Sequence, residues 1–442
     1  MRVHVIAIGG AIMHNLAIAL SRKGYQVTGS DDAIYDPAKS NLESASLLPS
    51  SFGWDAKRIT ADIDVVILGM HARANNPELL KAQELGLKIM SFPEFVANES
   101  KDKKRIVVAG SHGKTTTTAM LMHVLRKMDI DFDYLVGSSI AGFDLSVKLT
   151  DAPIIVIEGD EYLTSPLDLR SKFLWYEPHL SIITGVAYDH INVFPTWESY
   201  VDTFRKYIDS HQDGSKCFWY AEDETLAQLS AETSVLNEAY QTPNYTSSNQ
   251  GTILHTAAGE YELQVVGKHN LENLRAAELV CAELGITQEQ FYKAAADFSG
   301  AGRRMEKIYS SDNQVIYRDF AHSPSKLKAT TSAIKETYVG GVLAVFELHT
   351  FSSLTADFLP LYKQSMDAAD RAIVYYDKDV FAHKKMPILG AEYIAECFGD
   401  VSVISSRAEL EEAVNAGITA GLNILLMSSG TFSGANFDMP LG

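Results

Sequence analysis

The chain has 442 residues, 46% of them hydrophobic, and a formal net charge of −18 at pH 7. It is long enough for about three domains of ~150 residues, each with a substantial core. The acidic balance argues against nucleic acid or a membrane surface as partner, since both carry negative charge. Because no run of ~18 apolar residues occurs and the three cysteines have no metal or redox spacing, we expect a cytoplasmic enzyme.

The first third of the chain is typical of a Rossmann-like unit. Residues 3–8 predict a buried parallel strand, followed by Gly9, Gly10 and a helical pattern. A second strand over 25–28 leads to Asp31, about twenty positions past the glycines, where a nucleoside contact is expected. A tight turn followed by a solvated aspartate explains the same residues equally well. Further elements are expected as strands at 63–68 and 87–90 and a charged linker at 99–104.

A phosphate-binding loop is predicted where the apolar run 105–109 stops at a glycine and a helical pattern begins. Gly110 and Gly113 lack a Cβ, so backbone N–H groups can turn toward an anion at the positive end of the following helix. Lys114 adds a mobile positive charge, and the hydroxyl of Thr115 is placed to reach a Mg²⁺ ion held by the phosphates. The loop lacks the first glycine of the general pattern, but the apolar runs on both sides favour nucleotide binding over a chance turn.

Polar residues that suit a nucleotide follow the central strands. A buried strand runs into Glu158, and a carboxylate at the carboxyl end of a parallel strand beside a phosphate loop is where a Mg²⁺ ligand belongs. His190 follows the next strand, where chemistry alone favours a structural histidine because Mg²⁺ prefers oxygen. Asn270 and Asn273 sit one helical turn apart at a helix start, so both amides can face one ligand edge, although Asn270 can equally cap that helix.

The last third predicts another α/β domain, without a phosphate loop of its own. Gly300 and Gly302 mark a hinge, and a strand at 314–317 leads to Asp319. The remaining expected elements are a helix near 326–336 and strands at 342–346, 372–376 and 424–427.

Six segments taken together resemble the ATP-dependent Mur ligases of peptidoglycan metabolism, in an order and spacing that cover nearly the whole chain. They are 110–118, 158–161, 189–190, 267–273, 303–306 and 319–324. The resemblance implies an α/β fold of three domains. A Rossmann-like N-terminal domain over 1–101 would bind UDP, a central P-loop ATPase domain over 102–300 would carry a mainly parallel sheet, and a Rossmann-like C-terminal domain over 301–442 would bring the acceptor.

Within the family, the stretches 160–162, 170–178 and 427–434 favour ligases that take a cell-wall tripeptide. The resemblance then implies a ligase that joins UDP-N-acetylmuramate to L-Ala-γ-D-Glu-meso-diaminopimelate through an acyl phosphate, releasing ADP and phosphate, in peptidoglycan recycling. The main alternative adds L-alanine to UDP-N-acetylmuramate in de novo synthesis. A folylpolyglutamate-synthetase-like ligase is disfavoured by the two Rossmann-type flanks, and a non-catalytic nucleotide-binding regulator is the alternative from another class.

The resemblance also implies roles for single residues, with ATP and Mg²⁺ as cofactors. The catalytic residues would be Lys114, His190, Arg304 and Asp319. ATP would be bound by Gly110, Ser111, His112, Gly113, Lys114, Thr115, Thr116, Asn270, Asn273 and Arg304, and the metal by Thr115, Glu158 and His190. The UDP-substrate would be bound by Gly9, Gly10, Met13, Asp31, His71 and Ala72, and the acceptor by His322, Lys326 and His349. The expected partners are UDP-N-acetylmuramate and a short peptide, in a monomer or weak homodimer.

Two departures from the family's pattern touch the predicted site. Gly185 and Ala187 replace the Asn and Glu usually found shortly before Asp-His, so a different second metal shell is expected. Residues 347–353 contain no arginine, although relatives place one there for the carboxylates of the substrate. His349 or Lys326 is expected to take that role.

Overall fold

The structure, a computed structural model, describes residues 1–70, 72–165, 167–188, 193–236, 238–248, 251–302 and 304–440. These residues form two compact units, one within 1–240 and the other within 241–440. The domain boundaries predicted at 101/102 and 300/301 stay predictions.

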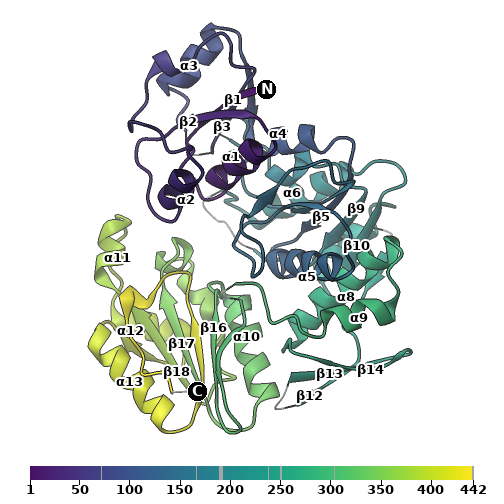
Figure 1. Cartoon of the computed structure of the whole chain (residues 1–442). Coiled ribbons are helices and arrows are strands. Elements are labelled where there is room, and N and C mark those ends of the chain that lie inside the picture. The colour runs from purple at the N-terminus through teal and green to yellow at the C-terminus, as the bar shows by residue number, and fades with distance from the viewer. Residues whose placement is uncertain are drawn as a thin grey trace. The chain divides into compact units, whose positions relative to one another are not determined.

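The N-terminal sheet of the first unit has four parallel strands in the order β2-β1-β3-β4 (Figure 1). Its elements are β1 (Arg2–Ile6), α1 (Met13–Arg22), β2 (Gln26–Ser30), α2 (Ala38–Ser44), the short 3-10 helix η1 (Ala56–Arg58), β3 (Val65–Leu68), α3 (Pro77–Glu84), β4 (Lys88–Ser91) and α4 (Phe92–Glu99). Successive side chains alternate between the two faces, so Val3 and Val5 pack with α1 and α4 whereas Ile6 packs with α3. The alternation of parallel strands with helices confirms the predicted Rossmann-like unit.

The second sheet of this unit has seven strands in the order β11-β10-β9-β5-β8-β6-β7, parallel except for β7. Its elements are β5 (Lys104–Ala109), α5 (Lys114–Lys127), β6 (Asp133–Leu135), β7 (Val147–Lys148), β8 (Ile154–Glu158), η2 (Lys172–Trp175), β9 (Leu180–Ile183), α6 (Trp197–Asp209), β10 (Lys216–Tyr220), α7 (Glu224–Ser230) and β11 (Glu238–Tyr240). Because β5 lies between β8 and β9, the loops that follow these three strands meet at one edge of the sheet.

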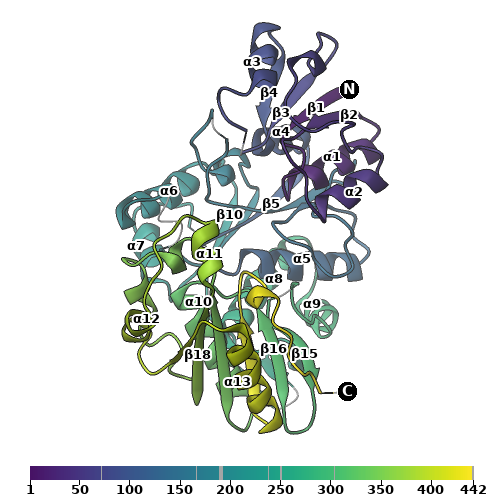
Figure 2. The same ribbon diagram turned by 90° about the vertical axis from the view of Figure 1, so that its left-hand side faces the viewer.

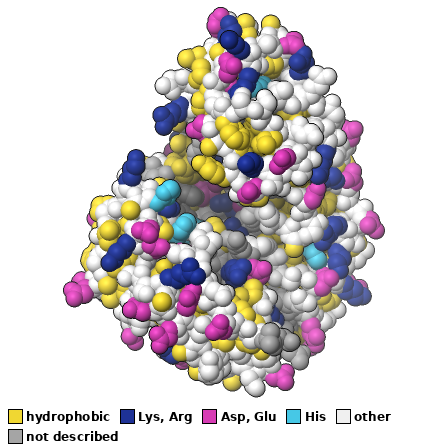
Figure 3. Space-filling view, turned by 60° about the vertical axis from the view of Figure 1, so that its left-hand side comes forward, with side chains coloured by type: hydrophobic (Ala, Val, Ile, Leu, Met, Phe, Trp, Pro, Cys, Tyr) yellow, Lys and Arg dark blue, Asp and Glu magenta, His cyan; other side chains and the backbone are white. Residues whose placement is uncertain are grey.

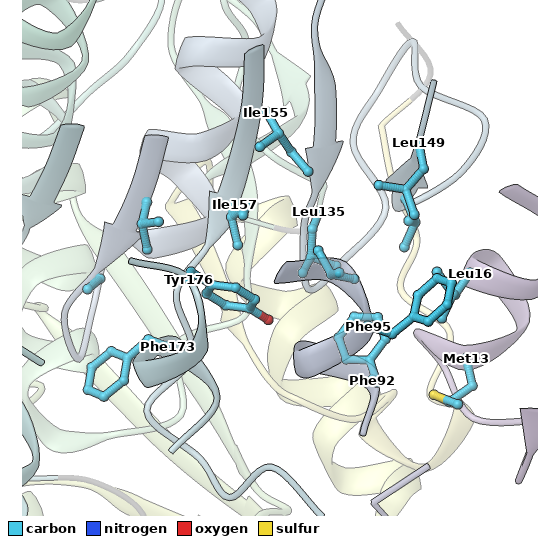
Figure 4. Packing of buried hydrophobic residues seen from close by; sticks show 14 of the residues in the cluster. Met13, Leu16, Phe92, Phe95, Leu135, Leu149, Ile155, Ile157, Phe173 and Tyr176 are labelled. Atoms are coloured by element: carbon cyan, nitrogen blue, oxygen red, sulfur yellow. The ribbon is translucent and has the colours of Figure 1, made fainter. Parts of the chain in front are cut away.

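The two sheets of the first unit share one hydrophobic core. Figure 4 shows Phe92 and Phe95 of α4 between Met13 and Leu16 of α1 on one side and Leu135 of the second sheet on the other. Burial of large aromatic side chains is a main source of folding free energy, so α4 ties the two sheets together.

The second unit begins with an antiparallel sheet, β12-β13-β14, which the sequence pattern did not predict. Its elements, with the two helices that follow, are β12 (Tyr245–Ser248), β13 (Gly251–Thr256), β14 (Gly259–Leu263), α8 (Lys268–Glu283) and α9 (Gln288–Ala295). The N-cap of α8 is Gly267, and Asn270 already lies in the first turn. The interpretation of Asn270 as the cap of this helix is therefore wrong.

The last sheet has six strands in the order β15-β16-β20-β17-β18-β19, parallel except for β15. Its elements are β15 (Glu306–Ser310), β16 (Val315–Asp319), α10 (Pro324–Thr337), β17 (Val342–Leu348), η3 (Ser352–Leu354), η4 (Leu359–Tyr362), β18 (Arg371–Tyr376), α11 (Lys378–His383), α12 (Ala391–Phe398), β19 (Ser402–Ile404), α13 (Arg407–Thr419), β20 (Asn423–Met427) and η5 (Phe432–Gly434). Leu343 and Val345 pack with α13, whereas Ala344 and Phe346 pack with α10 and α12. Helices therefore cover both faces of this sheet (Figure 2).

The surface and the cysteines agree with the composition. Acidic and basic side chains are interspersed over the face drawn in Figure 3, so the negative charge does not gather in one patch there. Cys217, Cys281 and Cys397 are buried and form no disulfide. None of the described helices is both long and apolar enough to cross a bilayer.

Candidate active site

The turn after β5 has the shape of an anion cradle. Gly110 and Gly113 have φ angles of 123° and 83°, which favour glycine. A Cβ at Gly110 would lie 2.1 Å from Oγ1 of Thr184, so space as well as conformation requires glycine there. Because α5 begins at Lys114, the unpaired N–H groups of its first turn face the loop, and Thr116 is buried in that turn. The predicted phosphate loop therefore has a geometry that fits a phosphate group.

The ammonium group of Lys114 is held inside this cradle. Its Nζ donates to the carbonyl oxygen of Gly110 at 2.7 Å and to Oε2 of Glu161 at 2.6 Å. Burial acts to lower the pKa of Lys114, but the carboxylates of Glu161, Asp160 and Glu158 outweigh it and the pKa lies above its ordinary value. The lysine is therefore charged at neutral pH and lies across the loop.

Thr115 and Glu158 provide two oxygen ligands that fit Mg²⁺. The hydroxyl of Thr115 donates to Oε1 of Glu158 at 2.7 Å, and the backbone N–H of Gly137 donates to Oε2 at 2.8 Å. Mg²⁺ prefers such oxygens and usually takes its other ligands from phosphates and water. The described residues contain no group of three or more His, Cys, Asp or Glu side chains that could hold a metal. The predicted ligand His190 lies outside the described residues.

Two buried residues that the sequence analysis did not assign to the site also contact the loop. The hydroxyl of Tyr200 on α6 donates to Oε1 of Glu161 at 3.0 Å and lies 2.7 Å from Oγ of Ser111. Glu161 belongs to the acidic segment after β8, which gave a signal that could have been used. Tyr200 gave none, because its position is that of an ordinary core aromatic. The backbone oxygen of His112 accepts a hydrogen bond from Thr184 at the same edge.

The loop after β1, predicted to bind the UDP-substrate, is held by Asp31. The backbone N–H of Gly9 donates to Oδ2 of Asp31 at 2.7 Å, and a Cβ at Gly9 would lie 2.9 Å from the same atom. Burial raises the pKa of Asp31 to about 6, although the hydrogen bond from Gly9 acts in the opposite direction. The structure thus gives Asp31 a backbone partner within the loop.

Gly10, Met13 and Ala72, also predicted to bind the UDP-substrate, lie in segments that follow strands β1 and β3 of the first sheet. The N–H of Gly10 donates to the carbonyl of Ala7 at 3.3 Å, which closes the turn. The side chain of Met13 is 4% exposed and packs in the core. Ala72 is buried, with its N–H bonded to Gly69 after β3. His71 lies outside the described residues.

In the second unit, Asn270 and Asn273 lie on the first turns of α8, each 5% exposed. Nδ2 of Asn270 donates to the carbonyl of Val266 at 2.9 Å, which fixes the orientation of this amide. An amide presents donors and an acceptor on one plane, the pattern that suits the edge of a base.

Asp319 of the second unit is hydrogen-bonded to Met305, the residue after Arg304, and to Thr330 of α10. Asp319 accepts hydrogen bonds from the N–H of Met305 at 2.8 Å and from the hydroxyl of Thr330 at 2.8 Å. The guanidinium of Arg304 lies 5.4 Å from the ring centre of Phe320, and no carboxylate among the described residues forms an ion pair with it. Asp319 thus anchors the backbone beside a cation that is available for an anionic ligand.

The predicted acceptor site lies at the carboxyl edge of the last sheet. Glu347, at the end of β17, is buried and accepts the N–H of Phe432 at 2.9 Å. Nδ1 of His349 lies 3.3 Å from the hydroxyl of Ser429, and a Cβ at Gly430 would lie 2.7 Å from the ring of His349. The glycine therefore allows the loop after β20 to close over the end of β17.

His322 and Lys326 lie at the same edge, where β16 leads into α10. The carbonyl of His322 accepts the hydroxyl of Tyr362 at 2.5 Å, and Lys326 lies half-buried in the first turn of the helix. Because β20 separates β16 from β17, these two residues and His349 follow different strands of one edge.

Lys384, after α11, was not predicted as a site residue. Its Nζ lies 4.7 Å from the ring centre of Phe351, and among the described residues no carboxylate pairs with it. Burial lowers the pKa of His349, and the positive charge of Lys384 lowers it further. No sequence signal marked Lys384, because it belongs to no motif.

Models of known families match three successive parts of the chain. Residues 2–104 match the Mur ligase family, catalytic domain, residues 108–281 the Mur ligase middle domain, and residues 303–430 the Mur ligase, glutamate ligase domain.

The chain is also similar to named ligases along most of its length. It is 28% identical to a UDP-N-acetylmuramate–L-alanine ligase of Carboxydothermus hydrogenoformans, over 99% of this chain and 96% of the relative. It is 31% identical to the enzyme of the same name from Limosilactobacillus reuteri, over 93% of this chain and 89% of the relative. It is 30% identical to the UDP-N-acetylmuramate–L-alanyl-γ-D-glutamyl-meso-2,6-diaminoheptandioate ligase of Haemophilus influenzae, over 78% and 79%.

Solved structures share the fold. A UDP-N-acetylmuramate–alanine ligase from Thermotoga maritima matches with a TM-score of 0.72 at 21% identity, over 98% of this chain and 97% of that one. A murein peptide ligase from Psychrobacter arcticus matches with a TM-score of 0.67 at 24% identity, over 99% of this chain and 97% of that one. The predicted three-domain α/β fold with mainly parallel sheets is thereby confirmed. The chain belongs to the Mur ligase family, whose members are ATP-dependent ligases that form carbon–nitrogen bonds, and the predicted enzyme class is confirmed.

Proposed function

We propose that the chain joins the lactyl carboxylate of UDP-N-acetylmuramate to the amine of L-alanine, with conversion of ATP to ADP and phosphate. The observation that carries the proposal is the loop after β5, where a charged lysine, a hydroxyl and a carboxylate converge on a cradle of backbone N–H groups. L-Alanine replaces the tripeptide predicted first, because the relatives in the comparisons are mostly L-alanine ligases. The tripeptide remains the alternative acceptor, and peptidoglycan recycling depends on it.

The proposed chemistry has two steps. The carboxylate oxygen forms a bond to the γ-phosphorus as the bond to ADP breaks, and the amine then displaces phosphate from the acyl phosphate and loses a proton. Attack of one anion on another is slow unless charge is offset and the groups are aligned. Lys114 supplies a fixed positive charge, and Mg²⁺ bound by Thr115 and Glu158 would offset phosphate charge. His190 stays a proposed second metal ligand.

The other predicted residues keep their roles as part of this proposal. Asn270 and Asn273 present buried amides to adenine. Arg304, which forms no ion pair with a described carboxylate, offers its guanidinium to phosphate, and Asp319 anchors the adjacent backbone. The UDP-sugar is assigned to the loop after β1, and the domain ranges 1–101, 102–300 and 301–442 would separate donor, nucleotide and acceptor. The monomeric or weakly dimeric state and the cytoplasmic location stay predictions.

We propose Lys384 as the cation for the acceptor's carboxylate. His349 was predicted as one substitute for the absent arginine, but its lowered pKa makes it neutral at pH 7. A neutral imidazole can donate a hydrogen bond to a carboxylate but offers no charge. Burial lowers the pKa of Lys384 from the ordinary value of a lysine, which lies far above neutrality. No carboxylate pairs with Lys384 among the described residues. Within this proposal Lys384 supplies the positive charge at this edge, in addition to Lys326 of α10.

The test is release of phosphate from ATP by the purified chain with Mg²⁺, with each substrate added in turn. Release should require both UDP-N-acetylmuramate and L-alanine, and mass spectrometry should find the amide product. Release with the tripeptide but not with L-alanine would move the assignment to the alternative acceptor. A chain that binds ATP but releases phosphate with neither acceptor would be a nucleotide-binding regulator.

A further inference from the structure

The phosphate loop is joined to two other loops by a chain of buried hydrogen bonds. Glu161 and Tyr200 are both 0% exposed, and Ser111 is buried beside them. The chain runs from Nζ of Lys114 to Glu161 at 2.6 Å, from Glu161 to the hydroxyl of Tyr200 at 3.0 Å, and from Tyr200 to Oγ of Ser111 at 2.7 Å. It ends at the backbone N–H of Ala187, which donates to Ser111 at 2.8 Å.

The direction of each hydrogen bond follows from the chemistry of its ends. An ionised carboxylate only accepts, so the hydroxyl of Tyr200 donates to Glu161 and accepts the hydroxyl proton of Ser111. Ser111 in turn accepts the N–H of Ala187. Within these contacts, each hydroxyl donates one hydrogen bond and accepts one. Such a network holds its members more firmly than separate pairs would.

The position of Tyr200 is itself fixed by aromatic packing. Tyr200 lies 5.4 Å from Phe204 and 5.2 Å from Phe194 between ring centres, with the rings edge to face. Tyr207 lies on the same helix, α6, is equally buried, and shares a 2.8 Å hydrogen bond with Ser181 instead of with the phosphate loop. The helix thus carries two similar tyrosines, of which one reaches the site.

The lysine keeps a donor for a ligand despite these contacts. An ammonium group has three N–H donors. Among the residues that the structure describes, Gly110 and Glu161 provide the two acceptors at hydrogen-bonding distance from Nζ. One N–H therefore stays available to a phosphate oxygen while the other two hold the side chain in place.

We propose that Glu161 and Tyr200 are positioning residues, which orient Lys114 toward the transferring phosphoryl group and keep that orientation when nucleotide binds. The proposal rests on the function proposed above. Many backbone N–H groups of the cradle contribute to binding of the nucleotide. The orientation of the Lys114 ammonium group matters most when charge develops in the transition state. Loss of this orientation of Lys114 should therefore lower kcat more than it weakens nucleotide binding.

The test compares Glu161→Gln and Tyr200→Phe with Tyr207→Phe in the full chain. Glu161→Gln keeps the size of the side chain and removes its charge, and Tyr200→Phe removes one hydroxyl from the network. Tyr207→Phe is the matched control, because it removes an equally buried hydroxyl from the same helix. Three quantities are measured: the melting temperature, the Kd for a non-hydrolysable ATP analogue with Mg²⁺ by calorimetry, and kcat for phosphate release with UDP-N-acetylmuramate and the acceptor that the unsubstituted chain uses.

We expect kcat to fall at least tenfold in Glu161→Gln and at least threefold in Tyr200→Phe, with the Kd for the analogue changed less than threefold. Tyr207→Phe should keep kcat within twofold, whatever its melting temperature. The proposal is overturned if kcat holds in both variants, if Tyr207→Phe loses as much, or if the whole effect appears in Kd. Tighter analogue binding by Glu161→Gln would also overturn it, because Glu161 would then compete with phosphate for Lys114. Failure of the unsubstituted chain to bind the analogue would instead contradict the proposed function itself.

Discussion

Thr115 and Thr118 are buried threonines one turn apart on α5, and their hydroxyls differ in surroundings. Thr115 donates to Glu158, whereas the hydroxyl of Thr118 has no hydrogen-bond partner among the described residues. If Thr115 is a metal ligand, replacement of its hydroxyl by a methyl group should affect chemistry, and the same change at Thr118 should not.

We predict that Thr115→Val lowers kcat about 100-fold, which corresponds to about 2.7 kcal/mol of lost transition-state stabilisation, and raises the Mg²⁺ concentration needed for turnover. Thr118→Val should stay within about twofold of the unsubstituted chain, since it removes an unbonded buried hydroxyl. Steady-state kinetics over a Mg²⁺ titration measure both. Equal losses in the two variants would argue against a special role of Thr115.

The loop residues Lys114 and Thr115 could be predicted from sequence because a short chain segment forms the whole cradle. Glu161 lies in an acidic segment whose signal was not used, and Tyr200 could not be predicted because the packing of α6 brings it to the loop. Their chemistry becomes visible only when their distances to Lys114 and Ser111 are known. Sequence reasoning finds residues that act through local geometry and misses those that act through tertiary contacts.

Asp31 makes the stability of the first unit depend on pH. Its pKa is raised from 3.8 to about 6 in the folded chain, mainly by burial. A raised pKa favours the protonated form in the folded state, so the stability from this group is full below about pH 4 and is lost as pH rises through 6. One pKa unit corresponds to about 1.4 kcal/mol, so a rise from 3.8 to about 6 limits the effect to about 3 kcal/mol.

Asp31→Asn should remove this dependence, because the amide stays neutral and its oxygen can still accept the N–H of Gly9. Urea unfolding of both proteins at steps between pH 4 and pH 7 gives the difference in unfolding free energy. We expect the variant to gain stability relative to the unsubstituted chain as pH rises across this range. A difference that is flat with pH, or that falls, would show that Asp31 is ionised in the folded chain throughout.

At the scale of elements, the strands of the parallel sheets follow from sequence more readily than the other elements. Parallel strands buried on both faces are continuous apolar runs bounded by turns, as in β5, β8 and β17. The sheet β12-β13-β14 was missed because its strands are mixed in polarity and partly exposed. Lys384 was missed because only the fold brings α11 beside the end of β17.

The position of α11 leads to a prediction about the acceptor. Lys384→Met keeps most of the aliphatic stem, and with it the contact with Phe351, but removes the charge. It should raise the KM for the acceptor at least tenfold, while the KM values for ATP and UDP-N-acetylmuramate stay within about twofold, since one charge-assisted hydrogen bond contributes about 1.5–3 kcal/mol. Lys378→Met, at the exposed start of the same helix, is the control. Equal acceptor KM values in both variants would contradict the assignment.

At the scale of the whole molecule, the first unit holds a core that reaches both of its sheets, and the second unit holds clusters on both faces of its six-stranded sheet. The first unit is the more unusual, since one core serves a four-stranded and a seven-stranded sheet. This continuity implies that the two sheets of the first unit lose stability together.

Phe95→Ala should test this continuity, because Phe95 lies in the part of the core shared by both sheets (Figure 4). We expect a loss of about 3–5 kcal/mol in unfolding free energy for the first unit, with faster amide hydrogen exchange in both β1 and β8. Leu410→Ala, in the core of the second unit, should leave exchange in β1 and β8 unchanged. Faster exchange confined to β1 in Phe95→Ala would mean that the sheets have independent cores.

The central claim is that ATP activates the lactyl carboxylate of UDP-N-acetylmuramate by transfer of a phosphoryl group to it. The most direct measurement supplies that substrate with ¹⁸O in the carboxylate, together with ATP, Mg²⁺ and L-alanine, and analyses the released phosphate by mass spectrometry. The account predicts one ¹⁸O atom in each phosphate released and an amide product that retains the other. Amide product accompanied by unlabelled phosphate would contradict the acyl phosphate, and ATP consumption without any amide product would contradict the ligase.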